Sequence, residues 1–295
     1  MNINRWISQN TDSLKGKTVA VTGSTGGLGN ELCEILASLS ANLVLLDRNA
    51  EKSRKFGEKL KEKHPLISIE YITVDLSVFQ SVKAATEKLK ELSPDILILN
   101  AGAYSIPRYK TELGYHNVFQ INFLSPYYIT KQLLPVLREK SGRVVVVGSI
   151  AHNYSKTDKN DVDFWTRRAA SKVYGNAKRF LMFSLFELFK NETQVSLAVT
   201  HPGITFTGIT NHYPKLIFAV IKHPMKIIFM NPKKAVLSIV KGVFNETPHN
   251  TWWGPKLFGI WGMPKLSKLK TCKSAEQKKI FKISEKIYNK IGEKI

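Results

Sequence analysis

A tyrosine and a lysine four residues apart, Tyr174 and Lys178, are the side chains of this sequence best suited to proton transfer. On a helix, positions i and i+4 share one face, so the ammonium would stand beside the phenol. An ammonium close to a phenol favours the phenolate. We therefore expect a tyrosine pKa lowered toward neutrality and a hydroxyl that exchanges a proton with substrate. A tyrosine and a lysine at this spacing occur often by chance. Whether the pair indicates a catalytic site therefore depends on the motifs around it.

A glycine-rich turn near the amino terminus predicts a dinucleotide site. It covers residues 23–29, directly after the β-branched stretch 18–22 and before a helical stretch. Gly23 permits a tight turn, Gly27 lets the backbone approach a pyrophosphate, and Gly29 allows close helix–strand packing. The helix that begins there offers free N–H groups and a positive dipole end to phosphates.

The end of the second expected strand bears on which dinucleotide binds. Asp47 stands there, eighteen residues after Gly29. A carboxylate at this place accepts hydrogen bonds from the adenine-ribose hydroxyls and repels a 2′-phosphate, which favours NAD. Arg48 would instead bind a 2′-phosphate if Asp47 turned aside, and the glycine turn has no basic residue to assist it. We expect NAD as the preferred cofactor, with NADP as the alternative.

The elements that position these groups follow from alternating apolar and amphipathic stretches. Strands are expected at 18–22, 42–47, 67–74, 96–99, 143–147 and 195–200, and helices at 31–39, 50–63, 79–92, about 113–139 and about 171–190. Strands alternating with helices imply right-handed crossovers. The fold class is therefore α/β, a single Rossmann-type doubly wound parallel sheet with a C-terminal helical extension.

Past residue 200 the pattern loosens. Asn231 and Pro232 are a good helix start, and the stretch 274–277 has the pattern of a capping box. An amphipathic helix follows, with one apolar stripe formed by Ile280, Ile283, Ile287 and Ile291. We expect this stripe to dock on the domain rather than lie on lipid.

The 295 residues contain no linker, which predicts one domain: a core at about 15–254, a substrate lid at about 205–231 and an extension at about 255–295. The segment 212–230 mixes aromatic and aliphatic residues with turn formers. It would suit a lid over an apolar pocket or a basic, apolar patch on a membrane surface, and these two interpretations can coexist.

The net charge of +21 comes from 44 Lys and Arg against 23 Asp and Glu, with the lysines spread along the chain. This distribution is typical of solvated lysine faces, with an anionic membrane surface as the second interpretation. No nucleic-acid module is recognisable, so we expect no nucleic-acid partner. From the composition of residues 1–17 and 216–230 we expect no signal peptide and no bilayer-spanning segment.

The remaining side chains exclude other chemistry. Cys33 and Cys272 cannot form a disulfide framework, and a reducing cytoplasm suits them. His152, His201 and His212 lack the spacing of metal ligands and an accompanying acidic residue, so no metal is expected. We expect a cytoplasmic protein, with peripheral membrane contact and homo-oligomerisation left open.

Together these motifs resemble the short-chain dehydrogenase/reductase family. The family's Thr-Gly-x-x-x-Gly-x-Gly turn corresponds to residues 22–29, and its Asn-Ala-Gly after the fourth strand to residues 100–102. Ser149, Tyr174 and Lys178 match the family's catalytic serine, tyrosine and lysine, and Asn122 falls at its proton-relay asparagine. The matching motifs extend from about residue 15 to 207.

The resemblance implies hydride transfer between a nicotinamide and an alcohol or carbonyl carbon of a rather apolar small molecule. Tyr174 would be the general acid or base, and Ser149 would donate a hydrogen bond to the substrate oxygen. Lys178 would hold the ribose, and Asn122 would position water. The cofactor would contact Thr22, Gly23, Ser24, Thr25, Gly27, Leu28, Gly29, Asp47, Arg48, Asp75, Leu76, Asn100, Ala101, Gly102, Tyr174, Lys178, Pro202, Gly203, Thr205 and Thr207.

Two features refine the match. Ser149 and Tyr174 stand 25 residues apart, with a polar insertion between them, which is similar to the retinol dehydrogenase and protochlorophyllide reductase branch. The region from Trp252 onward is similar to the same branch. We expect the insertion and the segment 212–230 to form the substrate wall.

Two other function classes remain open. One is a nucleotide-binding protein without turnover, acting as a regulatory or membrane-peripheral scaffold. The intact Ser149, Tyr174 and Lys178 argue against it. The other is an epimerase or dehydratase that retains NAD. Cofactor that stays with the purified protein, with no net redox change on turnover, would indicate that class.

Overall fold

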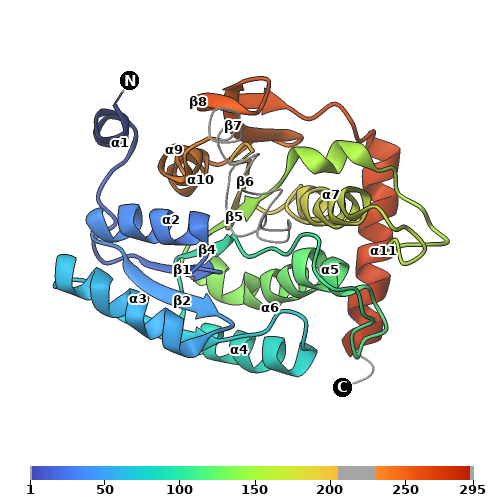
Figure 1. Cartoon of the computed structure of the whole chain (residues 1–295), viewed down its shortest axis with the longest axis horizontal. Coiled ribbons are helices and arrows are strands. Elements are labelled where there is room, and N and C mark those ends of the chain that lie inside the picture. Colours follow the sequence, from blue (N-terminus) through green and yellow to red (C-terminus); the bar gives the residue numbers. More distant parts are fainter. Residues whose placement is uncertain (1, 205–229, 293–295) are drawn as a thin grey trace, which may run out of the picture.

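The computed structural model describes residues 2–204 and 230–292, and in these residues one eight-stranded sheet runs through the molecule (Figure 1). The strand order is β3-β2-β1-β4-β5-β6-β7-β8, parallel except for the antiparallel pair β7–β8. The strands are β1 (Thr18–Thr22), β2 (Asn42–Asp47), β3 (Ile69–Thr73), β4 (Ile96–Leu99), β5 (Arg143–Val147), β6 (Ser196–Thr200), β7 (Thr251–Leu257) and β8 (Trp261–Lys268).

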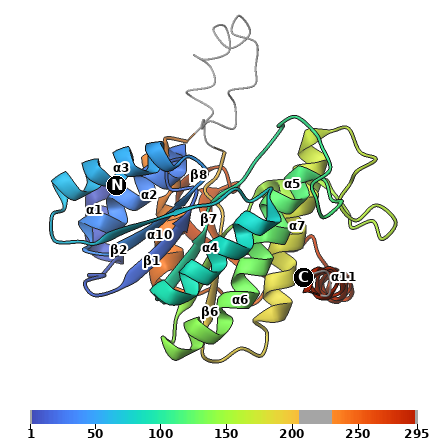
Figure 2. The same cartoon turned by 90° about the horizontal axis from the view of Figure 1, so that it is seen from below.

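Helices cover both faces of the sheet (Figure 2). They are α1 (Ile3–Asn10), α2 (Gly27–Ser38), α3 (Ala50–Lys63), α4 (Phe79–Leu92), α5 (Asn117–Phe119), α6 (Ser125–Glu139), α7 (Ala170–Leu188), α9 (Pro232–Ala235), α10 (Leu237–Phe244) and α11 (Ser274–Gly292). A π-helical turn, η1 (Gln120–Leu124), joins α5 to α6, and a 3₁₀ helix, η2 (Ile150–Tyr154), follows β5.

Alternation along the strands divides the interior into two cores. In β5, Val144 and Val146 pack with α4, α6, α7 and α11, whereas Val145 and Val147 pack with α1, α2, α3 and α10. Successive strand side chains point to opposite faces, so a strand covered on both faces becomes continuously apolar. The Rossmann-type α/β fold expected from the sequence is confirmed.

Most of the expected elements coincide with the observed ones. The helix expected at 31–39 begins earlier, at Gly27, and α1 was not expected. Two further regions differ more. The helical stretch expected from 113 begins only at Asn117, and a π-helical turn interrupts it at Gln120–Leu124. The extension is not only helical, because β7 and β8 add two strands to the sheet. Gly254, Pro255 and Pro264 hide the strand pattern there, and Pro264 is tolerated because β8 is the edge strand.

The terminal helix α11 docks as expected, with Ile280, Ile287 and Ile291 buried in the core beside α7. The expected capping box is wrong. Gln277 donates to the carbonyl of Cys272 at 2.9 Å, and Glu276 pairs with Arg179, so both side chains serve tertiary contacts. No helix within residues 2–204 and 230–292 has the length and apolar character needed to cross a bilayer.

Candidate active site

The glycine turn lies at the carboxyl end of β1 and is tied to the end of β4. Gly23 has a positive φ of 68°, and a Cβ there would come within 3.0 Å of the Ala101 Cα. A Cβ on Gly29 would lie 2.1 Å from the Gly23 carbonyl oxygen. Only glycine permits the turn and this helix–strand approach.

Hydrogen bonds between the two strand ends set the shape of the turn. Thr22 Oγ1 accepts the N–H groups of Asn100 and Ala101, each at 3.0 Å. Asn100 Nδ2 donates to the carbonyls of Thr22 and Gly23 at 3.0 and 3.1 Å. These side chains therefore act on the protein backbone and hold the turn open.

A cleft of about 520 Å³ opens beside this turn. It is lined by residues from the ends of the first four strands, namely Thr22, Gly23, Thr25, Leu46, Asp47, Arg48, Asn49, Lys52, Val74, Asp75, Leu76, Ala101, Gly102, Ala103, Tyr104, Ile106 and Ile121. Ligands of open α/β sheets bind at the carboxyl ends of the strands, where the strand order reverses, and β1 and β4 flank that point.

Asp47 lines this cleft, but its carboxylate is not free to bind a ribose as the sequence led us to expect. Its side chain is 4% exposed. One carboxylate oxygen accepts the hydroxyls of Ser24 and Ser53, and the other accepts the Thr25 N–H and Oγ1 at 3.0 and 2.9 Å. With four protein donors bound, the carboxylate braces the glycine turn instead of reaching toward a ribose.

Basic groups stand at the same end of the cleft. Arg48 and Lys52 are both exposed and line it. They flank the start of α3, whose N-cap residue Asn49 accepts the Lys52 N–H at 2.8 Å. The helix dipole adds positive potential to the two cationic side chains, so this end favours an anionic group.

Asp75 and Leu76 line the cleft after β3. One oxygen of Asp75 accepts the N–H and the hydroxyl of Ser77, at 2.8 and 2.6 Å. Ser81 supports the Asp75 backbone by accepting its N–H at 3.0 Å. The carboxylate is thus fixed in place, with its other oxygen free of these turn contacts.

Tyr174 and Ser149 come together although 25 residues separate them. Ser149 follows β5, Tyr174 lies on α7, and the Ser149 side chain stands close enough to the phenol to lower its pKa. Burial raises the pKa of the Tyr174 phenol to about 12, against the smaller lowering by Ser149, and Tyr104 raises it further. The expected lowering by Lys178 is not found, because enclosure of the phenol outweighs any such effect.

Lys178 lies behind Tyr174 on the same helix, with its Nζ 5.7 Å from the centre of the tyrosine ring. It is 2% exposed and donates to the Val147 carbonyl at 2.8 Å. Burial lowers the pKa of its ammonium to about 8. The amine therefore remains mostly charged at neutral pH and titrates within reach of ordinary buffers.

Asn122 lies in the π-helical turn and faces Lys178 across Gly102. Its Nδ2 donates to the carbonyls of Ala103 and Val118, both at 2.8 Å, and its Oδ1 accepts the Ala103 N–H at 3.2 Å. A Cβ on Gly102 would lie 2.8 Å from Asn122 Oδ1 and 3.6 Å from Lys178 Nζ. Glycine at 102 therefore leaves the space between the two side chains open.

Aromatic and aliphatic groups surround the phenol. Tyr104 meets Tyr174 edge to face at 5.4 Å between ring centres. Phe164 and Val173 are buried in a small cluster against which Ile106 and Tyr174 pack. The surroundings of the tyrosine are therefore mainly apolar.

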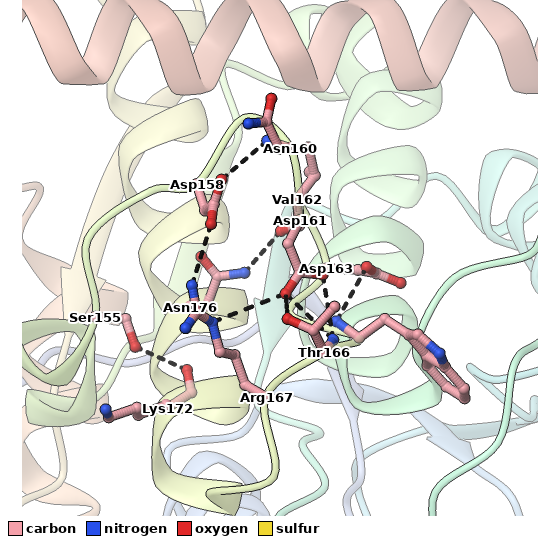
Figure 3. A network of polar contacts seen from close by, with 11 residues as sticks. Ser155, Asp158, Asn160, Asp161, Val162, Asp163, Thr166, Arg167, Lys172 and Asn176 are labelled. Atoms are coloured by element: carbon pink, nitrogen blue, oxygen red, sulfur yellow. Dashed lines mark hydrogen bonds and ion pairs between the residues drawn. The ribbon is translucent and has the colours of Figure 1, made fainter.

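The insertion between Ser149 and Tyr174 is held by its own polar network. Figure 3 shows Asp158 and Asp161 both directed at Arg167, with Asp158 Oδ2 at 3.1 Å from Arg167 Nη2. Asn176, two residues after Tyr174, donates to the Val162 carbonyl at 2.8 Å. The insertion is thereby fixed to the helix that carries the tyrosine.

Two histidines form an aromatic stack behind Ser149 instead of a metal site. His201 lies flat on Trp252 at 4.7 Å, and His152 meets Trp252 edge to face at 5.3 Å. Burial lowers the pKa of His152 to about 4 and that of His201 to about 3. Within the described residues no three His, Cys, Asp or Glu side chains gather to hold a metal, and His212 lies outside those residues.

The loop after β6 is described only in part. Gly203 has a φ of 83°, and a Cβ there would lie 2.6 Å from the Ile260 carbonyl oxygen. Pro202 is buried beside it. Thr205, Thr207 and almost all of the expected lid, residues 205–229, lie outside the described residues.

Sequence reasoning missed several residues of this site. Lys52 stands four residues after Arg48 at a helix start, a spacing that could have marked it. Tyr104 could have been suspected from its place after the Asn-Ala-Gly motif. Phe164 carries no local signal, because only its packing with Val173 and Tyr174 gives it a role.

Comparison with known proteins gives a consistent result. The family described as short chain dehydrogenase matches residues 17–215. Polyprenol dehydrogenase of Homo sapiens is 27% identical over 207 residues, 66% of this chain and 63% of that protein. Retinol dehydrogenase 12 of Mus musculus is 30% identical over 204 residues, 68% of this chain and 65% of that protein. The chain thus spans slightly less than two thirds of these relatives.

Solved structures share the fold. An uncharacterized protein from Mycobacterium Paratuberculosis superposes with a TM-score of 0.72 at 22% identity, covering 96% of this chain and 97% of that one. The RhlG/NADP complex of Pseudomonas aeruginosa superposes with a TM-score of 0.60 at 24% identity, covering 78% and 90%. At these identities the likeness concerns the fold.

Proposed function

The chain belongs to the short-chain dehydrogenase family, and on that premise we propose that it transfers a hydride between a nicotinamide cofactor and an alcohol or carbonyl carbon of a small apolar molecule. The observation that carries the proposal is the convergence of Ser149, Tyr174 and Lys178, from two separate elements, next to Gly102 and Tyr104, which line the glycine-turn cleft. Hydroxyl, phenol and ammonium together can bind a carbonyl oxygen and protonate it.

The cleft fits a dinucleotide. The open Gly102, the backbone of the glycine turn and the basic end at Arg48 follow one another along it. Ala101, Gly102 and the turn would hold the middle of the cofactor, and Lys178 and Asn122 its nicotinamide side. The bound nicotinamide supplies or accepts the hydride, and the protein residues orient the substrate and handle the proton.

Each catalytic side chain then has a distinct task. Tyr174 holds the transferable proton on its phenol oxygen, and Ser149 donates a hydrogen bond to the oxygen that gains negative charge. Lys178 keeps a positive charge behind the phenol and stabilises the phenolate left after proton transfer.

Carbonyl reduction and alcohol oxidation start from opposite protonation states of Tyr174. Burial raises the pKa of Tyr174 to about 12, so at neutral pH the phenol carries the proton that reduction requires. Alcohol oxidation starts from the phenolate, so we expect oxidation to be faster at alkaline pH.

The preferred cofactor follows from the orientation of Asp47. The sequence favoured NAD because a carboxylate facing the adenine ribose would repel a 2′-phosphate. Because Asp47 is turned into the glycine turn, Arg48 and Lys52 remain as the charged groups at that end. A 2′-phosphate there would gain charge-assisted hydrogen bonds from both, and we propose NADP(H) as the preferred cofactor.

The substrate is proposed to be apolar. Support comes from Tyr104, Ile106, Phe164 and Val173 around the phenol. The relatives named for retinol and polyprenol point to the same class, since both names denote lipophilic alcohols. Aldehydes or ketones with an extended hydrocarbon chain are the substrates to try first.

The test is a turnover assay with the purified full chain. Oxidation of NADPH and of NADH is followed by absorbance with a panel of aliphatic, isoprenoid and polar aldehydes and ketones. We expect turnover with the apolar members, faster with NADPH, and loss of turnover in Tyr174→Phe. Binding of cofactor without turnover of any carbonyl or alcohol would instead favour the scaffold interpretation. Cofactor that stays with the purified protein, with no net redox change on turnover, would favour an epimerase or dehydratase.

A further inference from the structure

Arg179 is a buried cation next to the catalytic lysine, and the proposed reaction does not use it. Its side chain is 1% exposed, and its guanidinium packs 5.3 Å from the ring centre of Phe183. Burying an isolated charge costs free energy, so a buried guanidinium needs acceptors around it. The acceptors of Arg179 show which parts of the chain it connects.

The guanidinium contacts three residues, Glu276, Thr271 and His152, in two separate regions of the chain. It donates to Glu276 at 3.1 Å from Nε and 2.8 Å from Nη2, and Glu276 stands in the first turn of α11. Nη2 also donates to the Thr271 carbonyl at 2.8 Å, and Nη1 to the His152 carbonyl at 3.2 Å. The first two contacts hold the C-terminal region, which Figure 1 shows next to α7, and the third holds η2.

The contact with His152 leads directly to Ser149. The His152 ring Nδ1 lies 2.7 Å from the Ser149 carbonyl oxygen, an acceptor, so this nitrogen carries the proton. The Ala151 N–H, in the same short helix, donates to Ser149 Oγ at 3.2 Å. A Cβ on Gly175 would lie 2.2 Å from the Ala151 carbonyl oxygen. Thus η2 is clamped on α7 by the close approach at Gly175 and by Arg179 one turn later.

Glu276 completes the connection. Its Oε1 also accepts the N–H and hydroxyl of Thr157, at 3.2 and 2.9 Å, at the start of the insertion. Burial would raise the pKa of Glu276, but hydrogen bonds from Arg179 and Thr157 outweigh it and lower the pKa. The carboxylate is therefore ionised and joins α11, α7 and the segment after Ser149.

We propose that Arg179 and Glu276 are positioning residues: α11, through this ion pair, fixes the segment 149–157 and so holds the Ser149 hydroxyl against Tyr174. The expected effect on kcat rests on the proposed function. The expected effect on the order of residues 149–157 rests on the contacts alone. Neither side chain touches the substrate. Reactive groups displaced by about 1 Å lose up to about a hundredfold in rate, so such a clamp has a measurable effect.

The first experiment uses Arg179→Lys in the full chain. A lysine keeps a charge for Glu276 but cannot donate to all three residues. With NADPH and an apolar aldehyde that the wild type reduces, we expect kcat to fall at least about tenfold, while the Kd for NADPH changes less than about twofold. Hydrogen exchange should accelerate in the segment 149–157 and stay unchanged in β1 and α3.

The second experiment separates positioning from stability. A single Arg179→Met leaves Glu276 without its cation and should lower Tm, and adding Glu276→Gln removes the uncompensated charge. We expect the double variant to regain most of the lost Tm without regaining kcat. If kcat recovers together with Tm, or never falls in Arg179→Lys, the pair only stabilises the fold and the inference is wrong.

A matched control exists at the other end of the molecule. Arg138 also donates two hydrogen bonds to a glutamate, Glu192, at 3.1 and 2.7 Å, but its side chain is 45% exposed and lies before the start of β5, whereas Ser149 follows the end of that strand. Arg138→Met should leave kcat and the exchange of 149–157 unchanged. If the wild-type chain turns over no substrate, the proposed function fails, and the exchange result alone then supports or overturns the clamp.

Discussion

The two halves of the molecule build their parts of the site from different materials. In the cofactor half, residues 18–99, backbone groups and small hydroxyls shape the glycine turn, and Asp47 is hydrogen-bonded by Ser24, Thr25 and Ser53 without a cation. The cations of this half, Arg48 and Lys52, are exposed. In the catalytic half, residues 143–292, ionisable side chains are buried among aromatic rings. Tyr174, Lys178, His152 and His201 all have displaced pKa values there.

The difference follows from the two tasks. A dinucleotide is held by many weak, geometrically fixed donors, which a glycine turn supplies at low cost in desolvation. Proton transfer depends on which group carries the proton, and burial is the strongest way to set that. The cofactor half should therefore respond to substitutions through affinity, and the catalytic half through rate and pH dependence.

The largest expected effect is in the catalytic half. Tyr174→Phe removes the transferable proton but keeps the ring against Tyr104, so turnover should fall at least about a hundredfold, the usual scale of general acid catalysis. The Kd for NADPH should change little. Tyr109→Phe, an exposed tyrosine, is the control. Near-normal turnover in Tyr174→Phe would show that the proton donor is another group, and the contrast between the two halves would then be wrong.

Lys178→Met tests whether one residue belongs to both halves. We expect kcat to fall by roughly tenfold to a hundredfold and NADPH binding to weaken, since the ammonium supports both the phenolate and the ribose. The Lys178 pKa of about 8 means that wild-type reduction should decline as pH rises through 8. The variant should lack that decline. If its pH profile matches the wild type, Lys178 acts in binding only.

The histidine stack should make the catalytic half sensitive to acid. His201 has a folded pKa of about 3, below the 6.5 of the unfolded chain, so the unfolded state binds more protons between those values. Stability is therefore lost as pH falls below 6.5, by roughly 2 kcal/mol for this imidazole at pH 5. His201→Phe keeps a ring on Trp252 and removes the titration. Urea unfolding at pH 7.5 and pH 5 should show a smaller difference in the variant, and an equal difference would refute the assignment.

The smallest expected effect is in the cofactor half. Arg48→Ala removes one charge-assisted hydrogen bond to a 2′-phosphate, so kcat/KM with NADPH should fall about tenfold while that with NADH stays within about twofold. Arg54→Ala, an exposed arginine on the same helix as Lys52, serves as the control. A wild-type enzyme that prefers NADH would overturn the NADP(H) proposal and leave the glycine turn unaffected.

The sequence predicted the cofactor half more completely than the catalytic half. The bounds of β1, β2, β4, α3 and α4 coincide with the expected ranges, because local periodicity and glycine spacing define them. The orientation of Asp47 was not predictable, since the hydroxyls that bind it come from a turn and a helix that must first pack together. In the catalytic half, β7 and β8 were missed, and the pKa of Tyr174 was expected to move in the opposite direction.

By itself the sequence determined most of the elements up to β6 and the order of the motifs, because a glycine turn and a helical i, i+4 pair are local features. The fold determined everything that depends on burial: the raised pKa of Tyr174, the direction of Asp47 and the clamp from Arg179 to Glu276. The two members of that clamp stand 97 residues apart in the chain. Burial of a side chain and pairing of two charges arise only when such distant residues come into contact. For that reason no spacing in the sequence predicts them.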